Sequence, residues 1–216
     1  IQNIGAYGVE IKDIFVSCSG YFLDTIEKKK FELNDCQFSY RSSIFKKSLR
    51  NKFIITEVVL QLSKTNHKIS KSYKSINDAL NKKKIHNPTI KDIARIVSKI
   101  RENKLPNPSI IGNSGSFFKN PIVSIELLNK LKQKFSKLVY FKESVSKYKL
   151  SAAWLIENCN FKNIEEKNVG VYKNQALVII NLGNATGKEI LLFSEKIKST
   201  VLEKFDILLE EEVNII

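Results

Sequence analysis

Residues Gly112–Pro121 read GNSGSFFKNP: two glycines and two serines, then a pair of phenylalanines, a lysine, an asparagine and a proline. Glycine is scarce in this chain, with 8 in 216 residues, so Gly112 and Gly115 mark a place where the backbone needs unusual freedom. The stretch alone leaves four interpretations open: a phosphate-binding loop, the nucleophile elbow of a hydrolase, a serine that donates a proton, or an ordinary turn. The rest of the chain has to decide among them.

The hydrolase interpretation lacks the residues that its chemistry needs. The pattern G-x-S-x-G ends in glycine, whereas Ser116 occupies that position here. A nucleophilic serine also needs a histidine base, and both histidines of the chain, His67 and His86, lie in a basic, irregular stretch. Acyl-transfer chemistry is therefore disfavoured.

A second glycine-containing stretch, GNATGKE at 183–189, resembles a phosphate loop only superficially. The spacing between its glycines is too short, and Glu189 stands where a serine or threonine would hold magnesium. Thr186 followed three residues later by Glu189 is instead a capping box, which predicts the start of a helix.

The composition is that of a globular protein, with 43% hydrophobic and 27% charged residues. The net charge is +14, but the lysines are spread along the whole chain, so we interpret them as a solvated surface and expect no nucleic-acid partner. No apolar run approaches the length of a membrane span and no signal peptide opens the chain, so we expect no membrane partner. The spacing of Cys18, Cys36 and Cys159 predicts neither a metal site nor a disulfide framework and favours a reducing cytoplasm.

Strand-forming residues dominate the first sixty positions. We expect strands within 9–23, 29–33 and 52–63, with a polar-aromatic connection at 34–49 that ends in a helical turn. Residues 67–88 are basic and predict a long irregular excursion.

A helix is predicted over 89–104, capped by Thr89 with Asp92. Its apolar stripe is expected to consist of Ile90, Ile93, Val97 and Ile100. The prolines of LPNPS end this helix, so we place a domain boundary near Pro106.

The second half alternates helix and strand. We expect helices around Leu127–Phe135, over 151–159 and over 186–205, and strands within 137–141 and 168–181. Residues 206–213 are predicted to close the domain as a C-terminal strand. The pattern is that of an α+β chain in two lobes.

Six segments, taken in order, resemble the family of UDP-N-acetylenolpyruvoylglucosamine reductases, in the class with an extra loop. The resemblance runs along essentially the whole chain, and its first three motifs are the most specific. The segments are IQNIGAYGVE, FSYRSSIFK, KLPNPSIIGNSGSFFKNP, KLSAAWLIE, NQALVIIN and LLEEEV.

The resemblance implies a fold and a reaction. Residues 1–105 would form the second lobe of a two-lobed FAD-binding domain, and residues 106–216 an α+β substrate-binding domain. The family uses FAD, with NADPH as reductant, to reduce UDP-N-acetylglucosamine enolpyruvate to UDP-N-acetylmuramate for peptidoglycan synthesis. Negative charge develops beside the substrate carboxylate, so a fixed cation and a positioned acid would both assist.

The resemblance also assigns roles to residues of this chain. Arg41 matches the carboxylate-side arginine, Ser116 the proton donor and Glu212 the active-site glutamate. Substrate contacts match Tyr73, Lys104, Asn120 and Gln175. Flavin contacts are expected at Gln2, Asn3, Ile4, Gly5, Ala6, Tyr7 and Arg101.

Two departures from the family pattern bear on these expectations. Glu211 replaces a proline and Asn214 replaces an arginine, which puts that arginine's help in doubt. The chain has no methionine and lacks the family's N-terminal flavin lobe, so we expect a piece of a longer protein that binds FAD poorly, and is inactive, by itself. The alternatives are a non-catalytic basic module that binds an anionic partner, and an inactive homologue.

Overall fold

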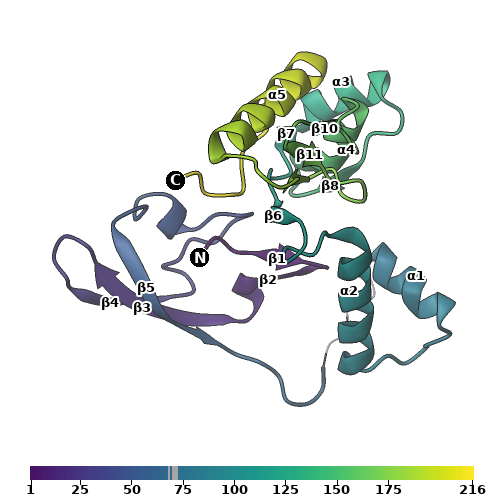
Figure 1. Cartoon of the computed structure of the whole chain (residues 1–216). Coiled ribbons are helices and arrows are strands. Elements are labelled where there is room, and N and C mark those ends of the chain that lie inside the picture. Colours follow the sequence, from purple (N-terminus) through teal and green to yellow (C-terminus); the bar gives the residue numbers. More distant parts are fainter. Residues whose placement is uncertain (68, 70–72) are drawn as a thin grey trace. The chain divides into compact units, whose positions relative to one another are not determined.

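The structure is a computed structural model that describes residues 1–67, 69 and 73–216. The chain forms two compact units, Ile1–Lys99 and Ile100–Ile216 (Figure 1). Helix α2, Ile90–Lys104, crosses the point of division.

The first unit is built on a three-stranded antiparallel sheet, which confirms the strand-rich prediction. The long strand β3 is central, and β4 and β5 flank it. One side of the sheet carries a small core in which Phe15, Phe31 and two cysteines are buried. The strands are β3 Phe15–Phe22, β4 Lys28–Glu32 and β5 Phe53–Leu60.

The N-terminal turn region is a tight hairpin of two short strands, β1 Gly5–Ala6 and β2 Val9–Glu10. Its two connecting residues, Tyr7 and Gly8, have φ of 55° and 86°. Positive φ at both positions is the geometry that fits the right-handed twist of a two-residue hairpin.

The predicted irregular excursion is wrong over part of its length, because Lys74–Lys82 form helix α1. Ile76 and Leu80, four residues apart, are its buried positions. Ile76, Ala79 and Leu80 form one apolar face at helical spacing. The prediction was wrong because it was based on the basic composition of the segment and not on this face.

Helix α2 confirms the prediction for this segment, including its cap. The Asp92 carboxylate accepts hydrogen bonds from the Thr89 backbone N–H (2.9 Å) and hydroxyl (2.7 Å). Three residues of the predicted stripe, Ile93, Val97 and Ile100, are half-buried. Ile90 is exposed, however, and the buried residue of the helix is Ile96, which the prediction did not include.

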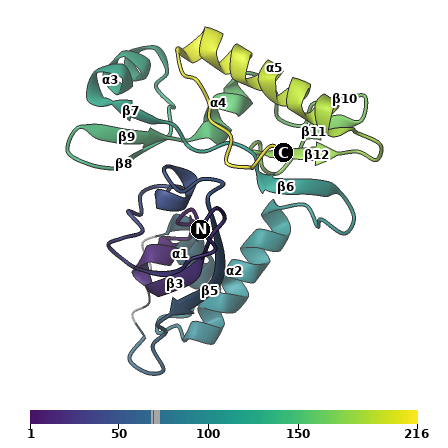
Figure 2. The same cartoon turned by 90° about the vertical axis from the view of Figure 1, so that its left-hand side faces the viewer.

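The second unit contains two antiparallel sheets and three helices. One sheet has the strand order β10-β11-β12-β6 and the other β7-β9-β8. Figure 2 shows helix α5 running along the sheet that contains β11 and β12. The elements are β6 Gly112–Ser116, β7 Ile122–Ser124, α3 Ile125–Lys134, β8 Tyr140–Lys142, β9 Lys147–Leu150, α4 Ala152–Asn158, β10 Glu165–Glu166, β11 Val169–Val171, β12 Val178–Asn181 and α5 Gly187–Phe205.

The core of the second unit is much larger than that of the first and receives side chains from all three helices and both sheets. Phe193, Ile197, Val201 and Phe205 of α5 are buried in it, as their spacing predicts. The capping box of Thr186 and Glu189 is also confirmed.

The predicted closing strand over 206–213 is not a regular strand. Ile207 and Leu209 are buried and their neighbours exposed, so the alternation of a strand is present. Among the residues that the structure describes, the segment forms one isolated bridge, between Phe118 and Glu211, because it runs beside an irregular stretch that follows β6.

Candidate active site

Arg41 lies at the tip of a tight turn in the first unit. The backbones of Ser39 and Ser42 exchange two hydrogen bonds of 3.1 Å, which close the turn. Arg41 has φ of 49°, a left-handed conformation that is costly for a residue with a side chain. Its guanidinium donates to the carbonyl oxygens of Gly5 (2.5 Å) and Asn3 (3.4 Å). A predicted carboxylate-binding cation is therefore fastened to the hairpin that is predicted to meet the flavin.

Asn3 is wholly buried, and its side chain links three segments of the first unit. Its amide nitrogen donates to the Glu10 carboxylate (2.9 Å) and to the Ser39 carbonyl (3.1 Å). Its amide oxygen accepts from the backbone N–H of Lys12 (3.1 Å). Any flavin contact by Asn3 would thus come from its backbone.

Glu10 carries the negative charge of this cluster. Burial alone would raise the pKa of its carboxyl group, but hydrogen bonds from the Lys12 and Asn3 side chains lower it, and the charges of Lys12 and Arg41 lower it further. The net direction is a pKa below the ordinary value of a glutamate, so Glu10 is ionised near neutral pH.

The other predicted flavin contacts are placed as follows. Ile4, Gly5 and Ala6 line a shallow apolar hollow of about 270 Å³ against the hairpin. Tyr7 packs edge-on against Tyr73, with ring centroids 5.1 Å apart, so this structure brings a predicted flavin residue and a predicted substrate residue together. Gln2 is half-buried and Arg101 is exposed near the end of α2.

Ser116 is the last residue of β6 in the second unit, half-buried and paired with Val178 of β12. Gly115 before it has φ of 72°, and the space where a β-carbon would lie has no atom within 4 Å. Phe117 and Phe118 after it are buried, with their rings 5.1 Å apart. The glycine thus turns the backbone at the serine, and the phenylalanines anchor it in the core.

Glu212 lies next to this stretch although it is far away in sequence. Its backbone N–H donates to the Phe117 carbonyl (2.8 Å), and the Lys119 N–H donates to the Glu210 carbonyl (2.9 Å). The crossing of the C-terminal segment therefore brings Ser116 and Glu212, two of the three predicted catalytic residues, to neighbouring backbone positions.

Two ion pairs fasten the crossing segment. Lys198 of α5 contacts both Glu211 (2.8 Å) and Glu195 (2.9 Å), and Lys119 pairs with Glu210. The hydrogen bond from Lys198 to Glu211 raises the pKa of the Lys198 ammonium group. Glu211 thus holds the C-terminal segment to α5.

Three further predicted substrate contacts lie in the second unit, outside its strands. The Asn120 side-chain oxygen accepts from the Ala152 N–H (2.9 Å) at the start of α4. Gln175 lies in the turn between β11 and β12, and its side-chain oxygen accepts weakly from Leu177 N–H (3.5 Å).

Lys104 is exposed at the end of α2. Asn174 donates to the Asn103 carbonyl (3.0 Å), so the residues next to Gln175 and Lys104 are in contact.

A pocket of about 480 Å³ adjoins the crossing and was not foreseen from the sequence. It is lined by neighbours of the predicted catalytic residues, Ser114, Phe117 and Val213, together with the first turn of α5. Asn214, the second departure from the family pattern, also lines it.

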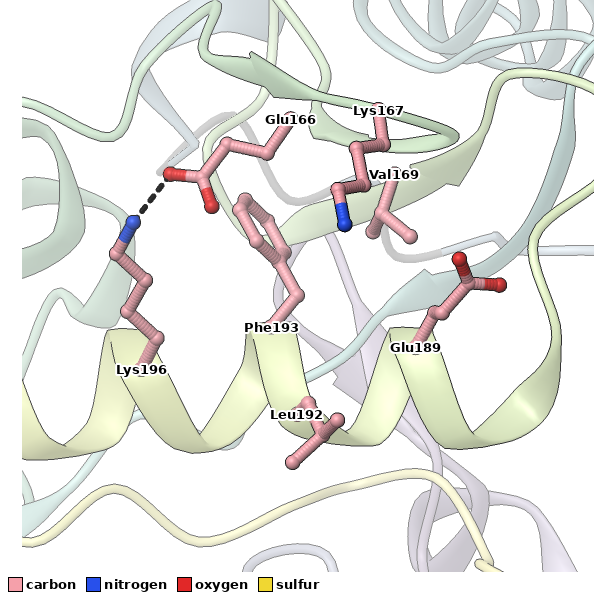
Figure 3. A pocket seen from close by; sticks show the side chains of 7 residues that line it. All are labelled: Glu166, Lys167, Val169, Glu189, Leu192, Phe193 and Lys196. Carbon is pink, nitrogen blue, oxygen red and sulfur yellow. Dashed lines mark hydrogen bonds and ion pairs between the residues drawn. The ribbon is translucent and has the colours of Figure 1, made fainter.

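A separate hollow of about 300 Å³ lies between the β10–β11 hairpin and α5 (Figure 3). Phe193 and Val169 form its apolar part, and Glu166 pairs with Lys196 at its edge. No predicted site residue lines it.

The described residues contain no group of three or more histidine, cysteine or acidic side chains arranged to hold a metal ion. Within the same residues, no helix has the length and apolar character to cross a membrane. Cys18 and Cys36 are free and buried, and burial raises the pKa of both thiols, that of Cys36 to about 12.

The family model of the UDP-N-acetylenolpyruvoylglucosamine reductase C-terminal domain matches residues 107–216, which is 110 (216 − 107 + 1) of the 216 residues. Three curated relatives, each named UDP-N-acetylenolpyruvoylglucosamine reductase, are similar over the whole chain. That of Flavobacterium johnsoniae is 49% identical, that of Amoebophilus asiaticus 44%, and that of Pseudomonas fluorescens 39%. Each match includes 100% of this chain but only 64%, 63% and 63% of the respective relative, so the chain spans less than two thirds of their length.

A crystal structure of UDP-N-acetylenolpyruvylglucosamine reductase from Thermus caldophilus matches 99% of this chain and 57% of its own, with a TM-score of 0.60. Its sequence is 19% identical, so this likeness supports the mixed helix and sheet fold alone. On the family match, the chain belongs to the UDP-N-acetylenolpyruvoylglucosamine reductase family and contains that family's C-terminal domain.

Proposed function

We propose that this chain carries the substrate-reducing part of a flavin-dependent, NADPH-using reductase that converts UDP-N-acetylglucosamine enolpyruvate to UDP-N-acetylmuramate in the cytoplasm. The observation that carries the proposal is the crossing of the C-terminal segment over the stretch that contains Ser116, which sets Glu212 beside it. Family membership gives this crossing a chemical meaning.

Ser116 is the proposed proton donor. A serine hydroxyl is a weak acid in water, but it can protonate a strongly basic, enolate-like carbon when it is held at close range. The left-handed Gly115 and the buried Phe117 and Phe118 support this role, since they fix the backbone on both sides of the hydroxyl. Glu212 would orient the serine or the substrate from the adjacent segment.

Arg41 is the proposed cation for the substrate carboxylate. Arginine suits this task because its planar guanidinium stays charged and can form two parallel hydrogen bonds with a carboxylate. Its strained turn and its bonds to the hairpin carbonyls favour a pre-organised group over a mobile surface arginine.

The hairpin at 4–10 has features that fit part of a flavin site. Its hollow is apolar, and Gly5 lines it. A β-carbon at Gly5 would lie 2.8 Å from the Val9 carbonyl oxygen, so this glycine lets the two strands of the hairpin approach closely. When bound, the flavin would supply the hydride. Donors for the pyrophosphate of FAD would come from the N-terminal flavin lobe that the resemblance implies for a longer protein.

In the second unit we propose Lys104 as a cation for the substrate diphosphate, with Asn120 and Gln175 as further polar contacts. Tyr73 of the first unit is a separate proposed substrate contact. The Asn120 oxygen accepts from the Ala152 N–H, which fixes this side chain at the start of α4. Lys104 and the turn of Gln175 are linked through the Asn174–Asn103 hydrogen bond, which favours a shared ligand.

The test is NADPH oxidation that depends on the enolpyruvyl sugar nucleotide, in the full-length protein. Ser116→Ala should leave flavin reduction by NADPH intact and lower substrate reduction by roughly 10²-fold or more. Ser109→Ala, at an exposed serine nearby, is the control and should retain the parent rate. A Ser116→Ala enzyme that turns over at the parent's rate would refute the proton-donor role.

The alternatives make different predictions. A salt-dependent shift on RNA or DNA, with no binding of UDP-sugars, would favour a basic binding module. An inactive homologue would bind the sugar nucleotide without turnover. The isolated 216-residue chain is expected to bind FAD poorly, and stoichiometric, tightly held flavin absorbance in it would contradict that expectation.

A further inference from the structure

We propose that Asn3 is a positioning residue for Arg41, and that its buried amide fixes the arginine turn to the N-terminal hairpin so that the guanidinium is ready for the substrate carboxylate. The inference rests on the proposed function for what Arg41 binds. The geometry that supports it does not depend on any ligand.

Three contacts form a closed circuit. Arg41 reaches from its turn to the hairpin carbonyls of Asn3 and Gly5. The Asn3 amide reaches back from the hairpin to the Ser39 carbonyl at the start of that turn. The hairpin and the turn are therefore joined at two points, one of which is a charged, half-buried side chain and the other a neutral, fully buried one.

Asn3 suits this place for two physical reasons. Its φ is 56°, and asparagine adopts the left-handed conformation more easily than other residues with side chains. Its side chain also combines a donor and an acceptor, and both are used here. The amide nitrogen donates to the Glu10 carboxylate and the Ser39 carbonyl, and the amide oxygen accepts from the Lys12 N–H. Leaving such buried partners unsatisfied is costly.

The circuit also explains how a strained arginine persists. A left-handed residue with a side chain is maintained only where its surroundings over-determine it. Without the Asn3 bond to Ser39, the start of the turn would lose its side-chain link to the N-terminal hairpin. Arg41 would then sample more conformations, and binding of a carboxylate would have to order it.

Two variants separate the side chain from the backbone requirement. Asn3→Gly keeps the left-handed backbone and removes the amide. Asn3→Asp keeps the shape but places a carboxylate oxygen against Glu10 and the Ser39 carbonyl, where the donor was. Asn51→Gly is the matched control, since Asn51 is also left-handed (φ 59°) but exposed and outside the circuit.

The first measurement needs no catalysis. Hydrogen exchange of the Ser39 and Ser42 amides, in the full-length protein without substrate, should become roughly tenfold faster in Asn3→Gly and Asn3→Asp. Strand amides of β3 should keep their protection, as should all amides in Asn51→Gly. Unchanged exchange of Ser39 and Ser42 in Asn3→Gly and Asn3→Asp would overturn the positioning role, whatever the reaction is.

The second measurement tests whether positioning of Arg41 by Asn3 contributes to binding of the substrate carboxylate. Asn3→Gly should raise the KM for the enolpyruvyl sugar nucleotide by roughly tenfold and leave the affinity for UDP-N-acetylglucosamine, which lacks the carboxylate, within about twofold. In an Arg41→Ala background the same change should have little further effect on KM. Equal weakening of both ligands would mean general loss of structure and would overturn the proposal, whereas an unchanged KM in Arg41→Ala itself would count against the proposed function.

Discussion

The turn of Arg41 and the crossing at Ser116 place predicted active-site residues by different means. In the first unit, Arg41 depends on hydrogen bonds from a few polar side chains, Asn3 above all, beside a small core. In the second unit, Ser116 and Glu212 are placed by backbone pairing over a large hydrophobic core.

The difference indicates how each region should respond to change. Hydrogen-bonded placement is sensitive to single polar atoms, because each buried partner must be satisfied. Residues that are positioned by a sheet on a large core should keep their place when surface residues are substituted. They should move mainly when core packing is lost. The chain offers a reporter for each unit: Trp154 is the only tryptophan and lies in the second, and Cys18 and Cys36 are buried in the first.

The largest expected loss of stability is from Gly20→Ala in the first unit. Gly20 lies in the central strand β3, and a β-carbon there would be 1.9 Å from the Ile54 carbonyl oxygen of β5. Because backbone cannot move aside cheaply, we expect a loss of about 3 kcal/mol or more of stability. In a Cys159→Ala background, Cys18 and Cys36 should react with an aromatic disulfide reagent far faster, while Trp154 fluorescence stays native.

Gly187→Ala is the control for that experiment. Its β-carbon would meet no atom within 4 Å, and it begins helix α5. A neutral effect or a small gain in stability is expected. Equal destabilisation by both alanines would contradict the steric argument.

The next largest loss of stability is expected from Ile197→Ala in the second unit. Ile197 is fully buried where α5 packs on the core, so its truncation should cost about 3 kcal/mol. The urea midpoint followed by Trp154 fluorescence should fall, and the reactivity of Cys18 and Cys36 should not change. A midpoint that stays constant would show that α5 contributes less packing than its burial indicates.

Regular elements were predictable from the sequence because their signals are local. The capping boxes at Thr89 and Thr186, and the spacing of Phe193, Ile197 and Val201, predicted two helices that the structure confirms. Helix α1 was not predicted because the basic composition of its segment was given more weight than its short apolar face. The predicted C-terminal strand was wrong because the alternation of apolar and polar residues indicates which side chains are buried. It does not indicate which backbone groups are available for pairing.

The site was only partly predictable. Arg41, Ser116 and Glu212 were named from a resemblance of motifs, and the contacts that connect Ser116 with Glu212 join residues that are almost a hundred positions apart. No local pattern revealed that Asn3 bonds to Ser39 or that Lys198 reaches Glu211. Such contacts depend on how strands and turns meet in space, which one sequence without relatives does not specify.

The smallest expected change in the free energy of unfolding comes from replacing either of two lysines of helix α5, Lys198 or Lys196. Lys198 and Glu211 are mostly buried, with side chains 16% and 20% exposed, whereas Lys196 and Glu166 are 52% and 42% exposed (Figure 3). Lys198→Met should cost about 1 kcal/mol because it leaves Glu211 without its cation, and Lys196→Met should cost less than about 0.5 kcal/mol because exposed pairs are screened. Trp154-detected urea unfolding measures both.

The pH dependence of that difference identifies its cause. Contact with Glu211 raises the pKa of Lys198 above its ordinary value, so the folded chain holds this proton more tightly than the unfolded chain does. The stabilisation should be fully present below pH of about 10.5 and disappear as pH rises through the folded-state pKa. The parent should therefore lose stability relative to Lys198→Met in strongly alkaline buffer, whereas a gap that does not change with pH would assign the effect to how the methionine packs and not to loss of the Lys198 charge.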